Sequence, residues 1–185
     1  MSDTITRKQP IITVREMTAA AMMTAVTAIC AWISVPANVP FTLQTFAIFT
    51  AVLILGAKGA TLSVLTYLLL GAVGVPVFAG FKGGLSIILG TTGGYMLGFL
   101  LIPLVCLGKE KIFGQKIIFT VAALLVGLLL CYTFGTSWFI HVSTKAVSVK
   151  QALKWCVIPF IIPDLMKLAL ALFVSYRVRK HLKFY

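Results

Sequence analysis

The stretch WCVIPFIIPDLMKLALALFVSY, residues 155–176, decides the class of fold. It is long enough to cross the hydrocarbon core of a bilayer, which takes about 20 mostly apolar residues. Its only charged residues are Asp164 and Lys167. A charge at the centre of a bilayer helix is disfavoured by roughly 2.5–3.5 kcal/mol on insertion scales, so such residues normally face the protein interior and serve a site. The stretch therefore predicts a transmembrane helix whose ionisable pair contacts a small polar solute.

The composition of the whole chain agrees with a membrane protein. The 185 residues are 60% hydrophobic and 11% charged, with a mean hydropathy of +1.06. One water-soluble core of this size could not hide so much apolar surface, so the bilayer must be the solvent. The formal net charge is +12, but the basic residues lie between apolar runs and do not gather in one block. This spacing is typical of membrane topology and argues against a nucleic-acid partner.

Six apolar runs predict six transmembrane helices, and hence an all-α integral membrane bundle. We place them at residues 17–35, 42–57, 60–78, 85–107, 116–135 and 155–176. Residues 1–16 then form a cytoplasmic N-terminal segment, residues 17–180 a single six-helix domain and residues 181–185 a cytoplasmic tail.

The basic residues predict the orientation. With both termini cytoplasmic, eleven of the sixteen fall on the inner side, which satisfies the positive-inside rule: Arg7, Lys8, Arg15, Lys58, Lys109, Lys111, Lys116, Arg177, Arg179, Lys180 and Lys183. The outer side has only Lys82, Lys145, Lys150 and Lys154. The chain is thus predicted to be a multi-pass protein of the cell membrane. Its outer connections are residues 36–41, 79–84 and 136–154, and the last has room for a short helix.

Asp164 is the only acid within an apolar run, since Asp3, Glu16 and Glu110 lie near the ends or in an inner loop. Lys167 follows three residues later, on the same face of a helix. The pair has two readings. It could be an internal ion pair that only neutralises itself and holds two helices together, or it could contact a ligand. Prolines at positions 159 and 163 favour a ligand site, because they free backbone groups that a cavity could satisfy and lipid could not.

Two copies of G-x-x-G-G stand at residues 80–84 and 90–94, and Tyr95 follows the second. Glycine lets backbone N–H groups approach a ligand, and successive amides can cradle an anion such as a carboxylate. Glycine at small-xxx-small spacing, as at Gly94 and Gly98, equally permits close helix packing. Lys82 beside the first copy favours a ligand role there.

Small and polar residues mark two further places. The run VPFTLQ at residues 39–44 brings Phe41, Thr42 and Gln44 to the outer end of the second span, where they could line a pocket or cap a helix. Ala21 and Ala25, at i and i+4 in the first span, form a stripe that would admit another helix closely. That helix could belong to this chain or to a partner.

Several functions are disfavoured by missing motifs. The sequence has no G-x-x-x-x-G-K-[ST] loop for ATP, no zinc motif and no cluster typical of an enzyme. The four cysteines, Cys30, Cys106, Cys131 and Cys156, fall within apolar runs without a C-x-x-C spacing, so we expect buried, inert thiols. Six helices without an evident inverted repeat make a small package for alternating access by one chain. A partner or an oligomer is therefore expected.

Several motifs taken together resemble the BioY family, the biotin-binding S-components of energy-coupling factor (ECF) vitamin transporters. They are VPFTLQ at 39–44, LGAVGVPVFAGF at 70–81, Gly83-Gly84, Gly93-Gly94-Tyr95 and Pro163-Asp164-x-x-Lys167. The resemblance covers roughly residues 17–180. One departure is Thr91, which stands where the family usually has proline.

The resemblance implies a six-helix S-component that captures biotin from outside. Its partners would be a membrane coupling protein and two cytoplasmic ATPase subunits, so ATP would be used by the partners and the chain itself would hold no cofactor or metal. Ala21 and Ala25 occupy the place of the family's docking surface for the coupling protein. The implied ligand-site residues are Asp164, Lys167, Thr42, Gln44, Tyr95, Gly83 and Gly84.

The chemistry of biotin is compatible with these residues. Its ureido ring has two N–H donors and one carbonyl acceptor, which Asp164 and Lys167 could match. Phe41, Phe78 and Tyr95 are candidates for the walls around its bicyclic body, and Lys82 or the glycine amides could bind its carboxylate. The alternative is a secondary or proton-coupled carrier in which Asp164 titrates during transport.

Overall fold

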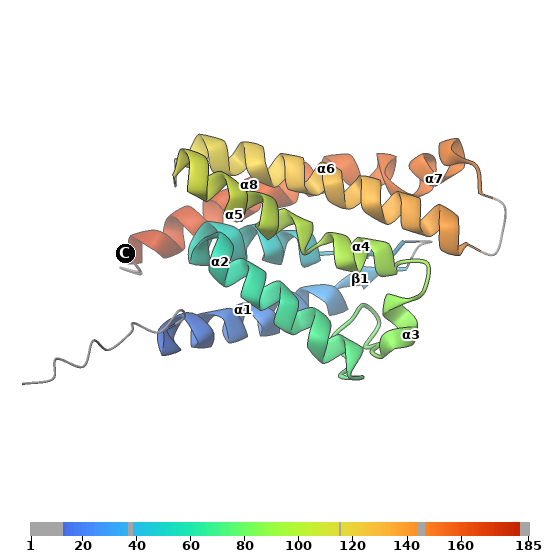
Figure 1. The fold of residues 1–185 in the computed structure, drawn as a ribbon, viewed down its shortest axis with the longest axis horizontal. Helices are drawn as coiled ribbons and strands as arrows, with labels where there is room; N and C mark the ends of the chain where they lie inside the picture. Colours follow the sequence, from blue (N-terminus) through green and yellow to red (C-terminus); the bar gives the residue numbers. More distant parts are fainter. Residues whose placement is uncertain (1–12, 37–38, 115, 144–146, 182–185) are drawn as a thin grey trace, which may run out of the picture.

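The computed structural model describes residues 13–36, 39–114, 116–143 and 147–181. The helices are α1 (Val14–Trp32), α2 (Gln44–Ala72), α3 (Leu85–Ile88), α4 (Gly93–Gly98), α5 (Leu101–Phe113), α6 (Ile117–Val142), α7 (Val149–Cys156) and α8 (Ile158–His181). Two short strands, β1 (Ser34–Val35) and β2 (Phe41–Thr42), pair antiparallel between α1 and α2. The protein is thus an all-α membrane protein apart from one small hairpin (Figure 1).

The first helix begins earlier than the predicted residue 17, because a capping box stops it fraying. The Thr13 hydroxyl accepts a hydrogen bond from the Glu16 N–H, and the Glu16 carboxylate accepts one from the Thr13 N–H at 2.7 Å. Two of the N–H groups that a helix leaves unpaired at its start are satisfied in this way. The helix ends at Trp32, so the last residues of the predicted span 17–35 belong to the hairpin.

The predicted second and third spans are the two halves of α2. The chain turns back on itself at Gly56, whose φ of 75° and ψ of 173° are not helical. The turn brings the two halves side by side, as the hydrogen bond of 2.6 Å from Gln44 Nε2 to the Tyr67 hydroxyl shows. Glu110 accepts a hydrogen bond from the Ala57 N–H at 3.0 Å, and this caps the second half from α5. The second half ends at Ala72, earlier than the predicted residue 78.

The prediction of one helix over residues 85–107 is wrong. The segment consists of α3, α4 and α5, which are separated by turns. Its glycines serve close packing: an added Cβ at Gly94 would lie 2.2 Å from Cβ of Trp138, and one at Gly98 would lie 2.9 Å from Sγ of Cys131. Both neighbours are on α6, so the second glycine motif presses α4 against α6, which is the packing alternative.

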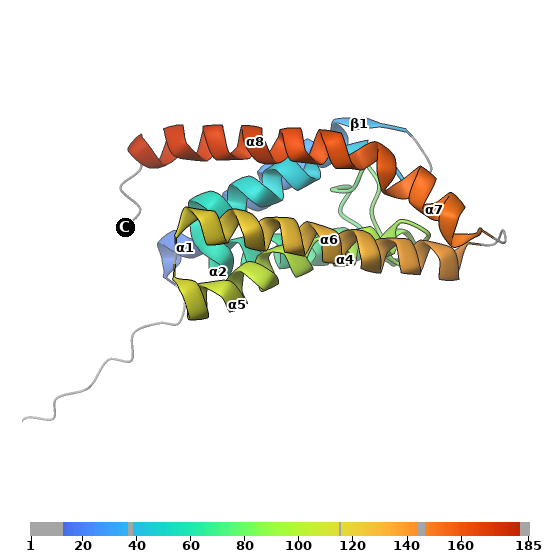
Figure 2. The same cartoon turned by 90° about the horizontal axis from the view of Figure 1, so that it is seen from above.

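The last two predicted spans are longer than expected. Helix α6 continues to Val142, seven residues beyond the predicted end. The expected short helix in the connection at 136–154 is confirmed as α7, which the backbone at Val157 separates from α8. Figure 2 shows α8 extending along the length of the molecule, with α7 at the end opposite the C-terminus.

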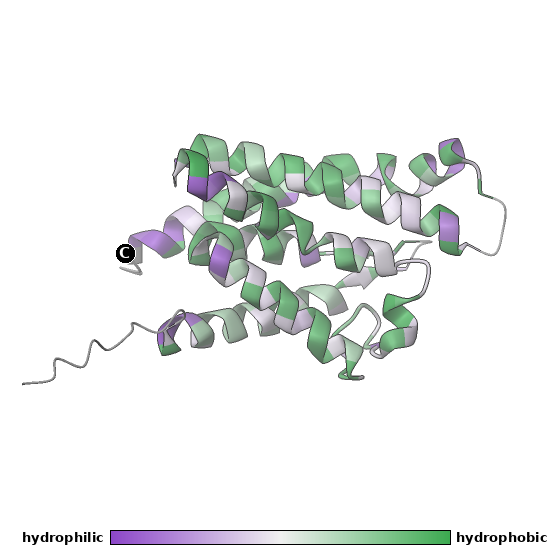
Figure 3. Cartoon of the chain, in the orientation of Figure 1, coloured by the Kyte–Doolittle hydropathy of each residue, from purple (hydrophilic) through white to green (hydrophobic). Residues whose placement is uncertain are grey.

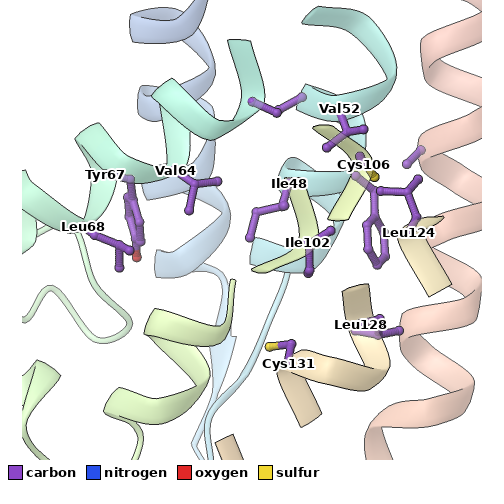
Figure 4. Close-up of a cluster of buried hydrophobic side chains, with 14 of the residues drawn as sticks. Ile48, Val52, Val64, Tyr67, Leu68, Ile102, Cys106, Leu124, Leu128 and Cys131 are labelled. Atoms are coloured by element: carbon purple, nitrogen blue, oxygen red, sulfur yellow. The ribbon is translucent and has the colours of Figure 1, made fainter. Parts of the chain in front are cut away.

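A buried apolar core joins the helices. In Figure 4 the labelled side chains from both halves of α2, from α5 and from α6 point toward one another, among them Ile48, Val64, Ile102 and Leu124. Ala31, Ala57, Ala60 and Ala171 are completely buried, which allows helix backbones to approach closely.

Hydrophilic residues are concentrated at the ends of the bundle and not along its length. Hydrophilic residues gather where α1 begins, where α2 turns, where α5 ends and where α8 ends (Figure 3). The described basic residues near these helix ends include Arg15, Lys58, Lys111 and Arg179, all predicted to be cytoplasmic. The hairpin and α7 lie at the other end (Figure 1). Within the described residues, four helical stretches are long and apolar enough to cross a membrane: Val14–Trp32, Gln44–Ala72, Ile117–Val142 and Val149–Lys180. The chain is a multi-pass membrane protein; six crossings and cytoplasmic termini stay predictions.

The turn at Gly56 gives a test of the fold. Its backbone lies in a region that L residues occupy only at a cost of about 1–3 kcal/mol, so Gly56→Ala should lower the free energy of unfolding by about that amount. Thermal unfolding of the purified chain measures it. Gly108→Ala is the matched control, because an added Cβ at Gly108, in helix α5, meets nothing within 4 Å. If Gly56→Ala and Gly108→Ala were equally stable, the prediction that a side chain at position 56 strains the backbone would be wrong.

Candidate ligand-binding site

The carboxylate of Asp164 is the centre of a polar network inside the bundle. Asp164 is 2% exposed, and its Oδ1 accepts hydrogen bonds from the Lys167 ammonium at 2.7 Å and from the Thr45 hydroxyl at 2.8 Å. Its Oδ2 accepts a hydrogen bond from the hydroxyl of Tyr132. Helices α2, α6 and α8 therefore meet at one carboxylate. The prediction that Asp164 and Lys167 share a helical face is confirmed by their ion pair.

The Lys167 ammonium is held between Asp164 and an aromatic ring. Its Nζ lies 4.3 Å from the centroid of the Phe41 ring, a cation–π contact. The Phe41 ring also packs on that of Phe160, with centroids 5.6 Å apart. Lys167 is 6% exposed. Phe41 thus contacts the Lys167 ammonium, but it does not line either of the cavities described next.

The pair lines a small inner cavity. Besides Asp164, Lys167, Thr45 and Tyr132, its walls are mainly apolar and come from Val39, Pro40, Thr42, Tyr95, Phe99, Leu128, Cys131, Cys156 and Phe160. Pro163 lies one residue before Asp164 within α8 and has no N–H to donate to the Pro159 carbonyl. A mainly apolar cavity with one charged pair is typical of a small-molecule site.

A larger outer cavity adjoins the inner one. The two share the walls formed by Val39, Pro40, Thr42, Tyr95 and Phe99. The outer cavity adds polar lining residues, namely Gln44, Lys82, Ser86, Thr91 and Thr92. No acid is among its described lining residues, so an anionic group would meet no like charge from them.

Hydrogen bonds fix the polar residues between the two cavities. The Thr42 hydroxyl donates to Gln44 Oε1 at 2.9 Å, and Gln44 Nε2 donates to the hydroxyl of Tyr67. The Tyr67 hydroxyl in turn donates to the carbonyl of Val77. Tyr95 shares a hydrogen bond of 2.8 Å with the Thr136 hydroxyl. Thr42, Gln44 and Tyr95 are all buried, so these bonds hold them in fixed orientations.

The glycines of the first motif, at residues 80–84, shape the loop next to the outer cavity and do not line it. Neither of the two cavities is lined by Gly83 or Gly84. An added Cβ at Gly83 would lie 2.4 Å from the Val75 carbonyl oxygen, and Gly84, at φ 103°, donates its N–H to the Gly71 carbonyl. These glycines fold the loop so that Phe78, which is 1% exposed, and Lys82 line the outer cavity.

Ala21 and Ala25 lie away from these cavities. Both are exposed on α1, while Ala20, Thr24 and Thr27 face the bundle. The helix that the stripe could admit is therefore not another described helix of this chain.

Two members of the network were not predicted. Thr45 follows Gln44 directly, and Tyr132 lies near the end of the predicted span 116–135. A hydroxyl in an apolar helix must find a partner or face a cavity, and this signal could have singled out Tyr132. Its partner is 32 residues away in the sequence.

The network limits what the pair can offer to a ligand. A carboxylate has about four acceptor positions and an ammonium has three donors. Asp164 uses three acceptor positions on protein groups and Lys167 one donor. The pair can therefore take one N–H from a ligand and donate to one or two acceptors. Within the described residues no group of three or more His, Cys, Asp or Glu could hold a metal ion, and the four cysteines are buried without disulfides.

A family model described as "BioY family" matches residues 3–184. The chain belongs to the BioY family. It is 40% identical over 172 residues to the biotin transporter BioY of Thermotoga maritima, a match that covers 90% of this chain and 96% of the relative. It is 39% identical to the probable biotin transporter BioY of Pyrococcus horikoshii, with 89% and 96% covered.

A solved structure also matches. The crystal structure of the S-component for biotin from an ECF-type ABC transporter superposes with a TM-score of 0.78 at 29% identity. The match covers 90% of this chain and 92% of that chain. The two chains therefore share one overall fold.

The pair is expected to respond unequally to the loss of either charge. Asp164→Asn leaves a buried ammonium without a counter-charge, so it should cost about 3–5 kcal/mol of stability. Lys167→Met should cost less, because the carboxylate keeps the hydroxyl donors of Thr45 and Tyr132. Thermal unfolding of the ligand-free variants compares them. A larger loss of stability for Lys167→Met than for Asp164→Asn would contradict this prediction.

Proposed function

We propose that this chain is the substrate-capture subunit of an ATP-driven ECF transporter, and that its substrate is biotin. One observation carries the proposal: in a member of the BioY family, a buried carboxylate–ammonium pair lines a cavity of the inner part of the bundle. The pair has the donors and acceptors that a ureido group requires. The chain carries out no covalent chemistry and needs no cofactor of its own.

The two cavities suit the two ends of biotin. The ureido ring has adjacent N–H and C=O groups, which match the free acceptor of Asp164 and the free donors of Lys167. The bicyclic body lies against apolar walls such as Tyr95 and Phe99. The carboxylate then extends into the outer cavity, where Lys82 and three hydroxyl side chains can donate to it.

Transport would depend on partner subunits. The sequence has no ATP-binding loop, so hydrolysis belongs to two cytoplasmic ATPase subunits that a membrane coupling protein joins to this chain. The exposed small residues Ala21 and Ala25 on α1 let a partner helix approach closely. In this assembly the chain lies in the cell membrane with its site open to the outside and both termini in the cytoplasm.

Biotin should stabilise the purified chain, and Lys167→Met should weaken that binding. Hydrogen bonds to charged groups contribute about 1.5–3 kcal/mol, which corresponds to a loss of about 10- to 100-fold in affinity. Isothermal titration calorimetry measures the affinity, and thermal shifts against a panel of vitamins test the choice of ligand.

Lys111→Met is the control for this change, because Lys111 is exposed in the last turn of α5 and lines neither cavity. It should bind biotin like the unmodified chain. Stabilisation by another vitamin and not by biotin would refute the proposed substrate. Unchanged affinity of Lys167→Met would refute the proposed contact.

Docking on α1 is tested separately from binding. Ala21→Leu with Ala25→Leu should reduce ATP-driven biotin uptake by roughly tenfold, because leucine keeps a partner helix at a distance. Biotin affinity of the solitary chain should not change. Val126→Leu, at an exposed position of α6, is the control. Uptake that continues without ATP and stops when the proton gradient is collapsed would instead favour a proton-coupled carrier that uses Asp164.

A further inference from the structure

The hydroxyl of Tyr132 reaches Asp164 from a different helix and orients it. We propose that Tyr132 on α6, together with Thr45 on α2, is a positioning residue for the ligand site: it acts on the ligand through Asp164 and Lys167. This inference rests on the proposed function, since the ligand whose binding it affects is biotin.

The geometry gives Tyr132 a specific task. Among the described residues, its hydroxyl is the one donor on Asp164 Oδ2, while Lys167 and Thr45 both bind Oδ1. Without that donor the carboxylate would be fixed by one oxygen only and could rotate about its side-chain bond. Buried in a medium of low dielectric, such a charge-assisted bond is stronger than a neutral one.

Thr45 restrains the same carboxylate from a second side. It lies in the first turn of α2, directly after Gln44, whose side chain is already held by Thr42 and Tyr67. These hydrogen bonds hold the first turn of α2, and with it Thr45, in a fixed position. Donors from α2 and α6 leave Asp164 with one orientation relative to the cavity.

The orientation of Asp164 determines that of Lys167. The ammonium is bound at 2.7 Å to Oδ1 and lies over the Phe41 ring, so its remaining donors have a limited range of directions. A rotated carboxylate would move the ammonium and redirect those donors away from a ligand carbonyl. Tyr132 therefore contributes to affinity even though its own hydroxyl is committed to Asp164.

The experiment compares Tyr132→Phe with Tyr176→Phe, because both remove one phenolic hydroxyl from a helix. Tyr176 is 72% exposed on α8 and lines neither cavity. Biotin affinity is measured by calorimetry for each. The chain has only two aspartates, Asp3 and Asp164, so aspartate labelled with ¹³C at Cγ gives two carboxyl resonances. Asp164→Asn identifies which of them belongs to Asp164.

We expect Tyr132→Phe to weaken biotin binding by about tenfold or more and to move the Asp164 resonance of the ligand-free protein. Tyr176→Phe should do neither. A weaker affinity with an unmoved Asp164 resonance would mean that Tyr132 contacts the ligand directly, and it would overturn the inference. Unchanged affinity of Tyr132→Phe would overturn it as well.

A second pair of variants covers the case in which Tyr132→Phe does not fold. Thr45→Val keeps the shape of the side chain and removes the donor on Oδ1, so it should move the same resonance and weaken binding. Thr133→Val, at an exposed position on α6, is its control. Failure of the unmodified chain to bind biotin would count against the proposed function, whereas the Asp164 resonance of ligand-free protein reports the contact itself.

Discussion

The structure depends on the need to satisfy one carboxylate inside an apolar bundle. A buried charge without partners would cost several kcal/mol, and Asp164 avoids this cost with an ammonium from α8 and hydroxyls from α2 and α6. The contacts from Thr45 and Tyr132 join α2 and α6 to α8, whereas the Lys167 contact lies within α8. Stability and the ligand site therefore share one set of atoms, and a carboxylate that joins three helices also lines a cavity.

The irregular parts of the fold place the walls around that pair. The turn at Gly56 brings Gln44 beside Tyr67, and the hairpin places Phe41 over the ammonium. The segment around the break between α3 and α4 forms part of the outer cavity, which is lined there by Ser86, Ile87 and residues 90–92. Backbone that is not helical is tolerated at membrane depth where it is buried in protein or lines a cavity.

Local patterns in the sequence were sufficient to predict part of the candidate site. The spacing of Asp164 and Lys167 predicted their ion pair, because three residues along a helix return to the same face. The contact from Thr45 to Asp164 could not be predicted this way, since 119 residues separate them. The glycines near Gly94 left two readings open, and only the position of Trp138 decides for packing. Apolar length alone likewise predicted one helix over 85–107, because hydropathy does not register the turns that packing imposes.

The arrangement also constrains how a bound ligand could be released. The donors of the site come from α2, α6 and α8, so the site keeps its affinity for a ligand only while those helices hold their relative positions. A partner can shift the equilibrium between this arrangement and a low-affinity one only if it makes different contacts with the two. Helix α1 carries the exposed small residues, and its Thr24 hydroxyl donates to the carbonyl of Ser63 in the second half of α2. The first half of α2 supplies Thr45. In the proposed assembly, a partner on α1 therefore contacts a helix that packs directly on α2, one of the helices that hold Asp164.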